Sequence, residues 1–406
     1  MPYKSLAKLF HKDPEHYEEI YQSRFHHENA RHLDFAIGDA PAFFLESSEL
    51  IYRLLAIERT DKEILKIAAL LPDAALAQFQ KRCLLDEMFL SNKMEGVHSS
   101  RRELLENLES PVRRNRFYGL VQKYVLLSQK ESIPLESCQD VRRLYDELLW
   151  TEIEYEDPKD LPDGEIFRKE SVSVSSEVQK EIHRGLYPEA AIREAMKKAL
   201  FILNDERIEI LFRIAIFHYL FGYIHPFYNG NGRMSRFISS YFLSREFSPL
   251  LAYRLSFTIK ESKSTYEKAF KTCNDPRNRG DLSPFLHTFL GFVEKAASQL
   301  LEALESRLEK LRYYKKILPL LPLYQEKQMD ELYAYLLQAS LFTDFGISTK
   351  DLLQLLEISH STLKKRLAPI IDSGLIELHT EGRANYYQLN LQRLDELFPP
   401  GKKPLL

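Results

Sequence analysis

HPFYNGNGRMSR, residues His225–Arg236, lies between two segments whose apolar residues recur at helical spacing. These residues are Ile208, Leu211, Phe212, Ala215, Ile216, Tyr219 and Leu220 before it, and Phe237, Ile238, Tyr241 and Phe242 after it. Pro226 disfavours helical geometry at His225, so the first helix is expected to end there. Gly230 and Gly232 permit a sharp turn and a close approach of the backbone to a ligand.

The second helix is expected to begin near Gly232. Backbone N–H groups and the positive dipole end at a helix N-terminus form a site for phosphate. Arg233 and Arg236 are three residues apart in that first turn, so they are expected to share a face and to bind phosphate oxygens. The stretch therefore predicts a phosphate cradle with His225 at its mouth.

The same stretch resembles the signature of the Fic-domain family, His-Pro-Phe-x-Asp/Glu-Gly-Asn-Gly/Lys-Arg-x-x-Arg, at every fixed position but one. An ordinary glycine-rich loop with a surface histidine is the alternative, but it does not account for the whole string. Fic enzymes mostly transfer AMP from ATP to a hydroxyl of a target protein. The resemblance implies that His225 is the general base, since an imidazole with a pKa of ~6.5 accepts a proton near neutral pH. It also implies that five residues bind the nucleotide: Gly230, Asn231, Gly232, Arg233 and Arg236.

Asn229 is the departure from the signature, since the family has an acid there that binds Mg²⁺. A carbonyl oxygen without a negative charge predicts weak Mg²⁺ binding. Three outcomes stay open: transfer with weaker metal dependence, use of another nucleotide or phosphate donor, or binding of a nucleotide without turnover. We favour weakened but real activity.

Ser91, Glu95 and Gly96 resemble a second family motif, Ser/Thr-x-x-x-Glu-Gly/Asn. Leu84, Leu85, Met88 and Phe89 predict a helix that Gly96 would terminate. The resemblance implies that Glu95 pairs with Arg236 and thereby inhibits ATP binding. A plain glycine-capped helix end is the alternative, and a hydrolytic role for Glu95 in reversing the modification also stays open.

Two further stretches resemble parts of the family's active site. Val172 and Val174 alternate with serines, the one clear strand signal that we find before residue 375. With Arg168 they resemble a flap, a hairpin that holds the target protein, and a simple surface hairpin is the alternative. Tyr266 aligns with a segment that lines the adenine pocket, and helix core is the alternative there.

The chain of 406 residues is long enough for several domains. We expect an N-terminal helical region at 1–80, a Fic-type domain at 81–299, a connector or dimer helix at 300–325, a small domain at 326–395 and a tail at 396–406. Glycine is scarce, which favours a mostly α fold. The resemblance implies a Fic-type helical domain with a small β-hairpin flap. A homodimer is left open.

The small C-terminal domain resembles a winged helix-turn-helix. Two helices are expected to begin at Ser348 and Ser359, followed by a hairpin that turns at Gly382. The resemblance implies that five residues contact DNA: Ser361, Thr362, Lys364, Lys365 and Arg383. Protein contact or dimerisation is the alternative, since Asp372, Glu377 and Glu381 dilute the positive charge.

The composition sets limits on location and partners. A net charge of -3 gives no general attraction to nucleic acid. Three widely spaced cysteines favour a reducing cytoplasm, and no apolar run long enough to cross a bilayer is found. The sequence therefore predicts a cytoplasmic protein adenylyltransferase that uses ATP and Mg²⁺ on an unknown protein target. A DNA-binding regulator that only senses a nucleotide is the main alternative, and a de-adenylylating hydrolase is the third.

Overall fold

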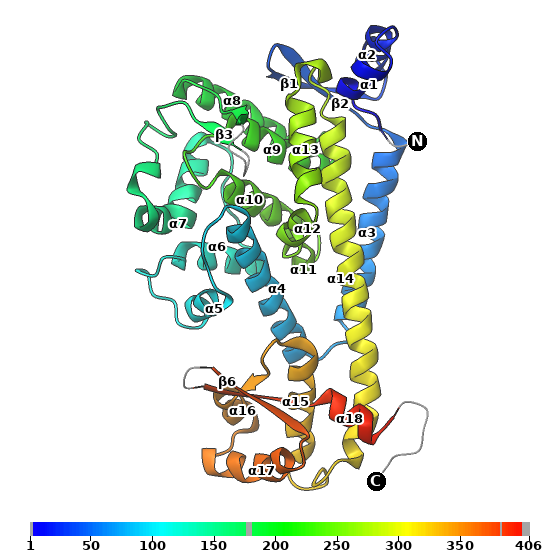
Figure 1. The fold of residues 1–406 in the computed structure, drawn as a ribbon, viewed down its shortest axis with the longest axis vertical. Helices are drawn as coiled ribbons and strands as arrows, with labels where there is room; N and C mark the ends of the chain where they lie inside the picture. The colour runs from blue at the N-terminus through cyan, green and yellow to red at the C-terminus, as the bar shows by residue number, and fades with distance from the viewer. Residues whose placement is uncertain (1–2, 176–180, 382–383, 400–406) are drawn as a thin grey trace. The chain divides into compact units, whose positions relative to one another are not determined.

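The computed structural model describes residues 3–175, 181–381 and 384–399. They are mostly α-helical with small antiparallel sheets, as the sequence predicts (Figure 1). The chain divides into two compact units, residues 1–62 with 84–300 and residues 63–83 with 301–406. These boundaries fall inside α3 (Ser48–Ala68), α4 (Asp73–Met94) and α14 (Ser283–Ile317).

The first unit contains most of the helices. Besides its parts of α3, α4 and α14, its elements are α1 (Leu6–Lys12), α2 (Tyr17–Phe25), β1 (Ala30–Ile37), β2 (Ala40–Leu45), α5 (Arg101–Glu109), α6 (Tyr118–Gln129), α7 (Cys138–Glu156), η1 (Pro158–Asp160), β3 (Ser173–Ser175), β4 (Glu181–Arg184), α8 (Glu189–Leu203), α9 (Ile210–Ile224), α10 (Asn231–Glu246), α11 (Pro249–Ala252), α12 (Leu255–Glu261), α13 (Lys263–Asn274) and η2 (Pro276–Asn278).

Helix α9 is the core of this unit. It is apolar nearly all round and buried along most of its length, as expected of a central helix. It packs against α8 and α10, and α10 also contacts α6, α11 and α12. Helix α9 ends at Ile224, directly before His225, and α10 begins at Asn231, so the helix–loop–helix unit predicted from the sequence is confirmed.

The N-terminal region contains a β-hairpin that the sequence analysis missed. Strands β1 and β2 pair antiparallel, with Ala30 opposite Leu45 and Ile37 opposite Ala40. Leu33, Phe35 and Ile37 are buried while their neighbours are exposed. This alternation is itself a strand signal, so the expectation that Val172 and Val174 carry the one clear strand signal before residue 375 is wrong.

The second unit contains a three-stranded sheet of order β5-β7-β6 with helices around it. Besides its parts of α3, α4 and α14, its elements are η3 (Leu318–Leu320), α15 (Met329–Phe342), β5 (Ile347–Ser348), α16 (Thr349–Leu356), α17 (His360–Asp372), β6 (Ile376–Glu381), β7 (Ala384–Leu389) and α18 (Leu391–Leu397). Ser348 and Ser359 cap α16 and α17 by accepting backbone N–H bonds, as predicted for the two helix starts.

Helix α14 is longer than the sequence analysis expected. It runs without a break through residue 300, where we expected a separate connector helix to begin. Gly291 lies inside it, and an isolated glycine weakens a helix by only about 1 kcal/mol relative to alanine. Among the described residues, no helix combines the length and the hydropathy needed to cross a membrane.

Candidate active site

His225 follows the last residue of α9 and adopts a left-handed conformation with φ +53°. This conformation is costly for a residue with a side chain and is often found where function requires it. Its carbonyl accepts a hydrogen bond from Arg168 Nε at 2.9 Å. Burial, together with the charges of Arg168 and His183, lowers the pKa of His225 to about 4, although Glu95 opposes the shift. The imidazole is therefore neutral at pH 7 and able to accept a proton.

The loop after His225 is fixed from within. Asn231 donates its amide to the Phe227 carbonyl at 2.8 Å and accepts the Phe227 N–H at 3.0 Å. Phe227 is fully buried and stacks on Tyr145 with ring centroids 3.8 Å apart. The side chain of Asn231 thus holds the loop, which differs from the phosphate contact implied by the sequence. Phe227 anchors the loop as expected.

A cavity of about 530 Å³ opens beside the first turn of α10. Its size is ordinary for a small-molecule site. It is lined by Lys93, Met94, Glu95, Gly96, His183, Gly222, His225, Asn231, Gly232, Ser235, Arg236, Lys263, Tyr266, Glu267, Phe270 and Asn274. The structure therefore brings together most residues of the predicted site around one hollow.

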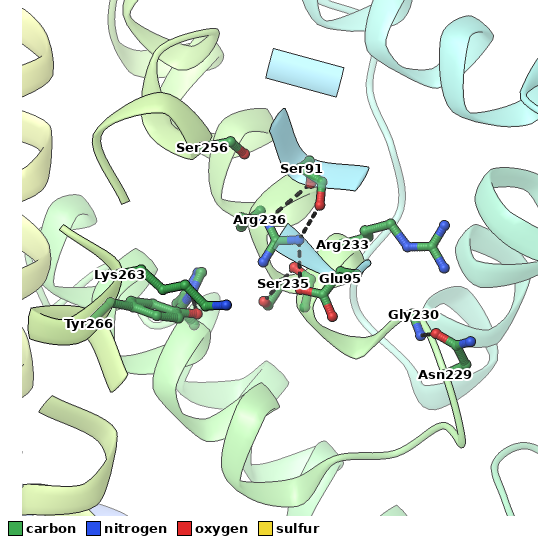
Figure 2. A network of polar contacts seen from close by, with 12 residues as sticks. Ser91, Glu95, Asn229, Gly230, Arg233, Ser235, Arg236, Ser256, Lys263 and Tyr266 are labelled. Atoms are coloured by element: carbon green, nitrogen blue, oxygen red, sulfur yellow. Dashed lines mark hydrogen bonds and ion pairs between the residues drawn. The ribbon is translucent and has the colours of Figure 1, made fainter. Parts of the chain in front are cut away.

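Arg236 is held by the end of α4. Its Nη2 lies 2.9 Å from Glu95 Oε1 and donates to the Ser91 carbonyl at 3.0 Å, and its Nε donates to the Ser91 hydroxyl at 3.0 Å (Figure 2). Burial raises the pKa of Glu95, but the Arg236 charge and hydrogen bond outweigh it, so the pKa is lowered overall and the carboxylate is ionised at pH 7. The contact between Glu95 and Arg236 implied by the sequence is confirmed.

Two glycines allow this contact. Gly96 has φ +75°, and hydrogen bonds from Gly96 N to Lys93 O and from Val97 N to Asn92 O close the end of α4. This is the Schellman arrangement of a helix end. A Cβ on Gly232 would lie 2.1 Å from Glu95 Oε1, so the Glu95 carboxylate rests on the first turn of α10. It occupies the position where a helix N-terminus favours an anion.

Comparison with known proteins identifies this region. Residues 136–243 match the Fic/DOC family. The chain contains a Fic/DOC family domain. Among solved structures, it is similar to a Fic family protein from Desulfovibrio desulfuricans G20, with 20% identity over 82% of this chain and 96% of that chain and a TM-score of 0.48.

Two further structures are similar to this chain. One is a Fic domain containing signaling protein from Bacteroides thetaiotaomicron VPI-5482, with 17% identity, 62% and 97% of the two chains covered, and a TM-score of 0.46. The other is Fic-1 from C. elegans, with 20% identity, 63% and 74% covered, and a TM-score of 0.41.

Arg233 of the Fic/DOC domain does not line the cavity. Its guanidinium is buried and pairs with Glu152 of α7, and Figure 2 shows it pointing away from Arg236 and Glu95. Arg233 therefore does not face the cavity that Arg236 lines, and its contact with phosphate stays a prediction. Among the described residues, Arg233 Nε and Nη2 have no hydrogen-bond partner.

Asn229 also lies outside the cavity lining. Its Oδ1 accepts the N–H of Gly230 at 2.6 Å, which fixes the amide orientation, and its Nδ2 donates to Asp160 at 3.0 Å. An amide oxygen and a nearby carboxylate suit Mg²⁺ when substrate phosphates supply further ligands. Within residues 3–175, 181–381 and 384–399, no group of three or more His, Cys, Asp or Glu side chains is placed to hold a metal.

Tyr266 is held by a buried hydrogen-bond chain. Ser239 donates to the Ser235 carbonyl at 2.8 Å, so it accepts from His218 Nδ1 at 2.8 Å. His218 Nε2 must then accept from the Tyr266 hydroxyl at 2.8 Å. Burial lowers the pKa of His218 to about 3, which keeps the ring neutral. This chain fixes the Tyr266 ring at the cavity wall, where the sequence analysis expected a contact with the base.

The predicted flap is a hairpin of β3 and β4, with Val174 opposite His183. Residues 176–180 and the side chain of Val174 are outside the described part. Val172 accepts the Gly185 N–H through its carbonyl at 3.0 Å. Arg168 is fully buried, and its guanidinium donates to the carbonyls of His225, Glu170 and Leu186. It supports the loop from inside, so the exposed target contact predicted for its side chain does not fit.

In the second unit, α17 exposes Ser361, Lys364 and Lys365, while Thr362 is half-buried. The hydroxyls of Ser361 and Thr362 both bond Ser359 at 2.9 Å. Arg383 lies outside the described residues.

Sequence reasoning missed Glu152 and Asp160. The apolar stripe of α7 includes Tyr145, Leu148 and Leu149, and Glu152 continues it. An acid on a buried stripe indicates a buried cationic partner, so the sequence around Glu152 did contain a sign of this pairing. Asp160 lies in a turn-rich loop and had none.

Proposed function

We propose that the Fic/DOC domain transfers AMP from ATP to a hydroxyl of a target protein, and that Glu95 restrains this transfer. One observation carries the proposal: the neutral His225, the first turn of α10 and Arg236 border one cavity, in which Glu95 occupies the anion position. A carboxylate in that position repels a triphosphate and withholds Arg236 from it.

The residues of the chain account for the chemistry. The target hydroxyl oxygen attacks the α-phosphorus of ATP, and its proton passes to the neutral ring of His225. The bond from the α-phosphorus to the bridging oxygen breaks, and pyrophosphate leaves. The N–H groups of the first α10 turn and Arg236 stabilise the phosphate charge once Glu95 has moved away. The proposal has the adenine ring pack against Tyr266, which His218 fixes at the cavity wall.

Mg²⁺ would be held by Asn229 and Asp160 together with the phosphates. The asparagine oxygen carries no charge, and Asp160 supplies one beside it. Mg²⁺ would neutralise phosphate charge in the reaction.

Transfer from ATP labelled at the α- or the γ-phosphate tests the chemistry. We expect Glu95→Gly to place the α label, and not the γ label, on itself or on lysate proteins. Adding His225→Ala should lower incorporation by about 10²- to 10⁴-fold. Incorporation of the γ label would indicate phosphate transfer and contradict the proposal. If the wild type releases AMP from prelabelled protein and Glu95→Gly does not, the result would favour a de-adenylylating hydrolase that uses Glu95.

A second candidate function concerns the second unit. Its order of helix, strand, two helices and a hairpin resembles that of a winged helix, and Lys364 and Lys365 are exposed on α17. These features support binding of duplex DNA by α17. The affinity should fall with salt, and replacing both lysines by alanine should reduce the salt slope by about 2. An unchanged slope would remove DNA as a partner of α17.

A further inference from the structure

Glu87 is a buried acid of α4 that the proposed reaction does not use. It is fully buried, and its carboxylate accepts two hydrogen bonds from one residue, from Ser256 N at 2.8 Å and from Ser256 Oγ at 2.6 Å. Glu87, Ser91 and Glu95 are spaced four residues apart, so they lie along one face of the helix. The face of α4 that holds Arg236 through Ser91 and Glu95 is therefore also bound to Ser256, through Glu87, two helical turns before Glu95.

Ser256 connects this face to the wall of the cavity. It is the second residue of α12, and the N–H groups of a first helical turn have no partner within their own helix. Glu87 thus caps α12 from a neighbouring helix. Only Ser262 separates α12 from α13, which contributes Lys263, Tyr266, Glu267 and Phe270 to the cavity.

Glu95 itself is weakly fixed by its local structure. It lies just past the last residue of α4, beside Gly96, and its side chain is 27% exposed. Glu87 lies eight residues earlier, which is about 12 Å along a helix. A helix is stiff over that length, so a shift of α4 at Glu87 moves Ser91 and Glu95 with it.

We propose that the contact of Glu87 with Ser256, here called the α4 latch, positions Glu95 on Arg236 and sets the strength of inhibition. Glu87 and Ser256 are positioning residues, because they act through Glu95 and neither lines the cavity. This inference rests on the proposed function, since it assigns a regulatory role within the same site.

The test compares Glu87→Ala and Ser256→Ala with the conservative variants Glu87→Gln and Ser256→Thr. Asp86→Ala is the matched control, because Asp86 precedes Glu87 on α4 and pairs with Arg101 instead. Label incorporation from α-labelled ATP and ATP affinity by calorimetry are both measured. We expect the two alanine variants to raise both quantities by about threefold or more, while the conservative variants and the control stay near wild type.

The same substitutions are repeated in Glu95→Gly. If the latch acts through Glu95, they change neither quantity in that background. An equal change in both backgrounds would mean a merely structural role and would overturn the inference. If Glu87→Ala does not fold, Ser256→Ala carries the test, since it removes a single hydroxyl.

The two proposals fail in different ways. If Glu95→Gly binds ATP but transfers no label, the proposed transferase fails, and ATP affinity still tests the latch. If Glu95→Gly transfers label and the folded latch variants match wild type in both quantities, only the latch is wrong.

Discussion

Arg233 and Arg236 lie one turn apart on α10, and each is paired with a carboxylate from another helix. The Glu152 partner of Arg233 lies within α7, and its side chain is 2% exposed. The Glu95 partner of Arg236 lies at the end of α4, and its side chain is 27% exposed. Two arginines in one helical turn therefore differ: the partner of Arg233 is enclosed in the core, and the partner of Arg236 is partly exposed.

The two carboxylates differ in the surroundings that each would enter if it left its arginine. Glu152 has no path to water without disrupting α7 packing, and it would strand a buried charge. Glu95 borders a cavity, and the proposed function requires it to leave Arg236 when a nucleotide binds. In this proposal Arg233 is part of the framework, and Arg236 is the charge for which a nucleotide competes. The following predictions test this comparison.

The largest effect is expected from breaking the framework pair. Glu152→Ala leaves Arg233 charged and unpaired in the core, which costs about 3–5 kcal/mol and lowers the melting temperature by roughly 10 °C. Glu95→Ala leaves Arg236 bonded to Ser91 and beside a cavity, so its cost should be smaller, about 1.5–3 kcal/mol. Thermal melting of both variants checks the difference. Equal losses of stability would contradict the distinction between the two arginines.

A smaller effect is expected at Asn229. Asn229→Asp removes the hydrogen bond to Asp160 and sets two carboxylates against each other, which costs about 1–2 kcal/mol without metal. Mg²⁺ with ATP should relieve this repulsion, so its stabilising shift in melting temperature should exceed that of the wild type. Adding Asp160→Asn to the variant is the control and should cancel the difference. A shift no larger than that of the wild type would argue against metal at this position.

The smallest effect concerns pH. The pKa of His225 is lowered to about 4, so its neutral, proton-accepting form persists well below pH 6. Transfer by Glu95→Gly should stay nearly constant from pH 7.5 to 5.5 and fall only near pH 4. A base with the ordinary pKa of ~6.5 would lose about tenfold at pH 5.5. A midpoint near 6.5 in kcat/KM would mean that the buried environment of His225 does not hold during the reaction.

The sequence predicts those features that depend on neighbouring residues. Pro226 and the glycines delimit α9, the loop and α10, and Gly96 ends α4 so that Glu95 reaches Arg236. The partners of Arg233, Asn229 and Ser256 lie 81, 69 and 169 residues away, and no local pattern pairs them. The burial of Arg168 had no local signal either, because its partners are backbone carbonyls. The hairpin of β1 and β2, in contrast, did have a local sequence signal, which is the alternation of Leu33, Phe35 and Ile37 with other residues.

The most direct test of the account is the incorporation of label from α-labelled ATP by three proteins assayed in parallel. They are the wild type, Glu95→Gly, and Glu95→Gly combined with His225→Ala. We expect Glu95→Gly to exceed the wild type by about tenfold or more, since a hydrogen-bonded charge pair contributes about 1.5–3 kcal/mol, and the double variant to lose about 10²-fold or more. Equal labelling by wild type and Glu95→Gly would contradict the restraint of Arg236 by Glu95. No labelling by any of the three, with ATP bound, would contradict the transfer itself.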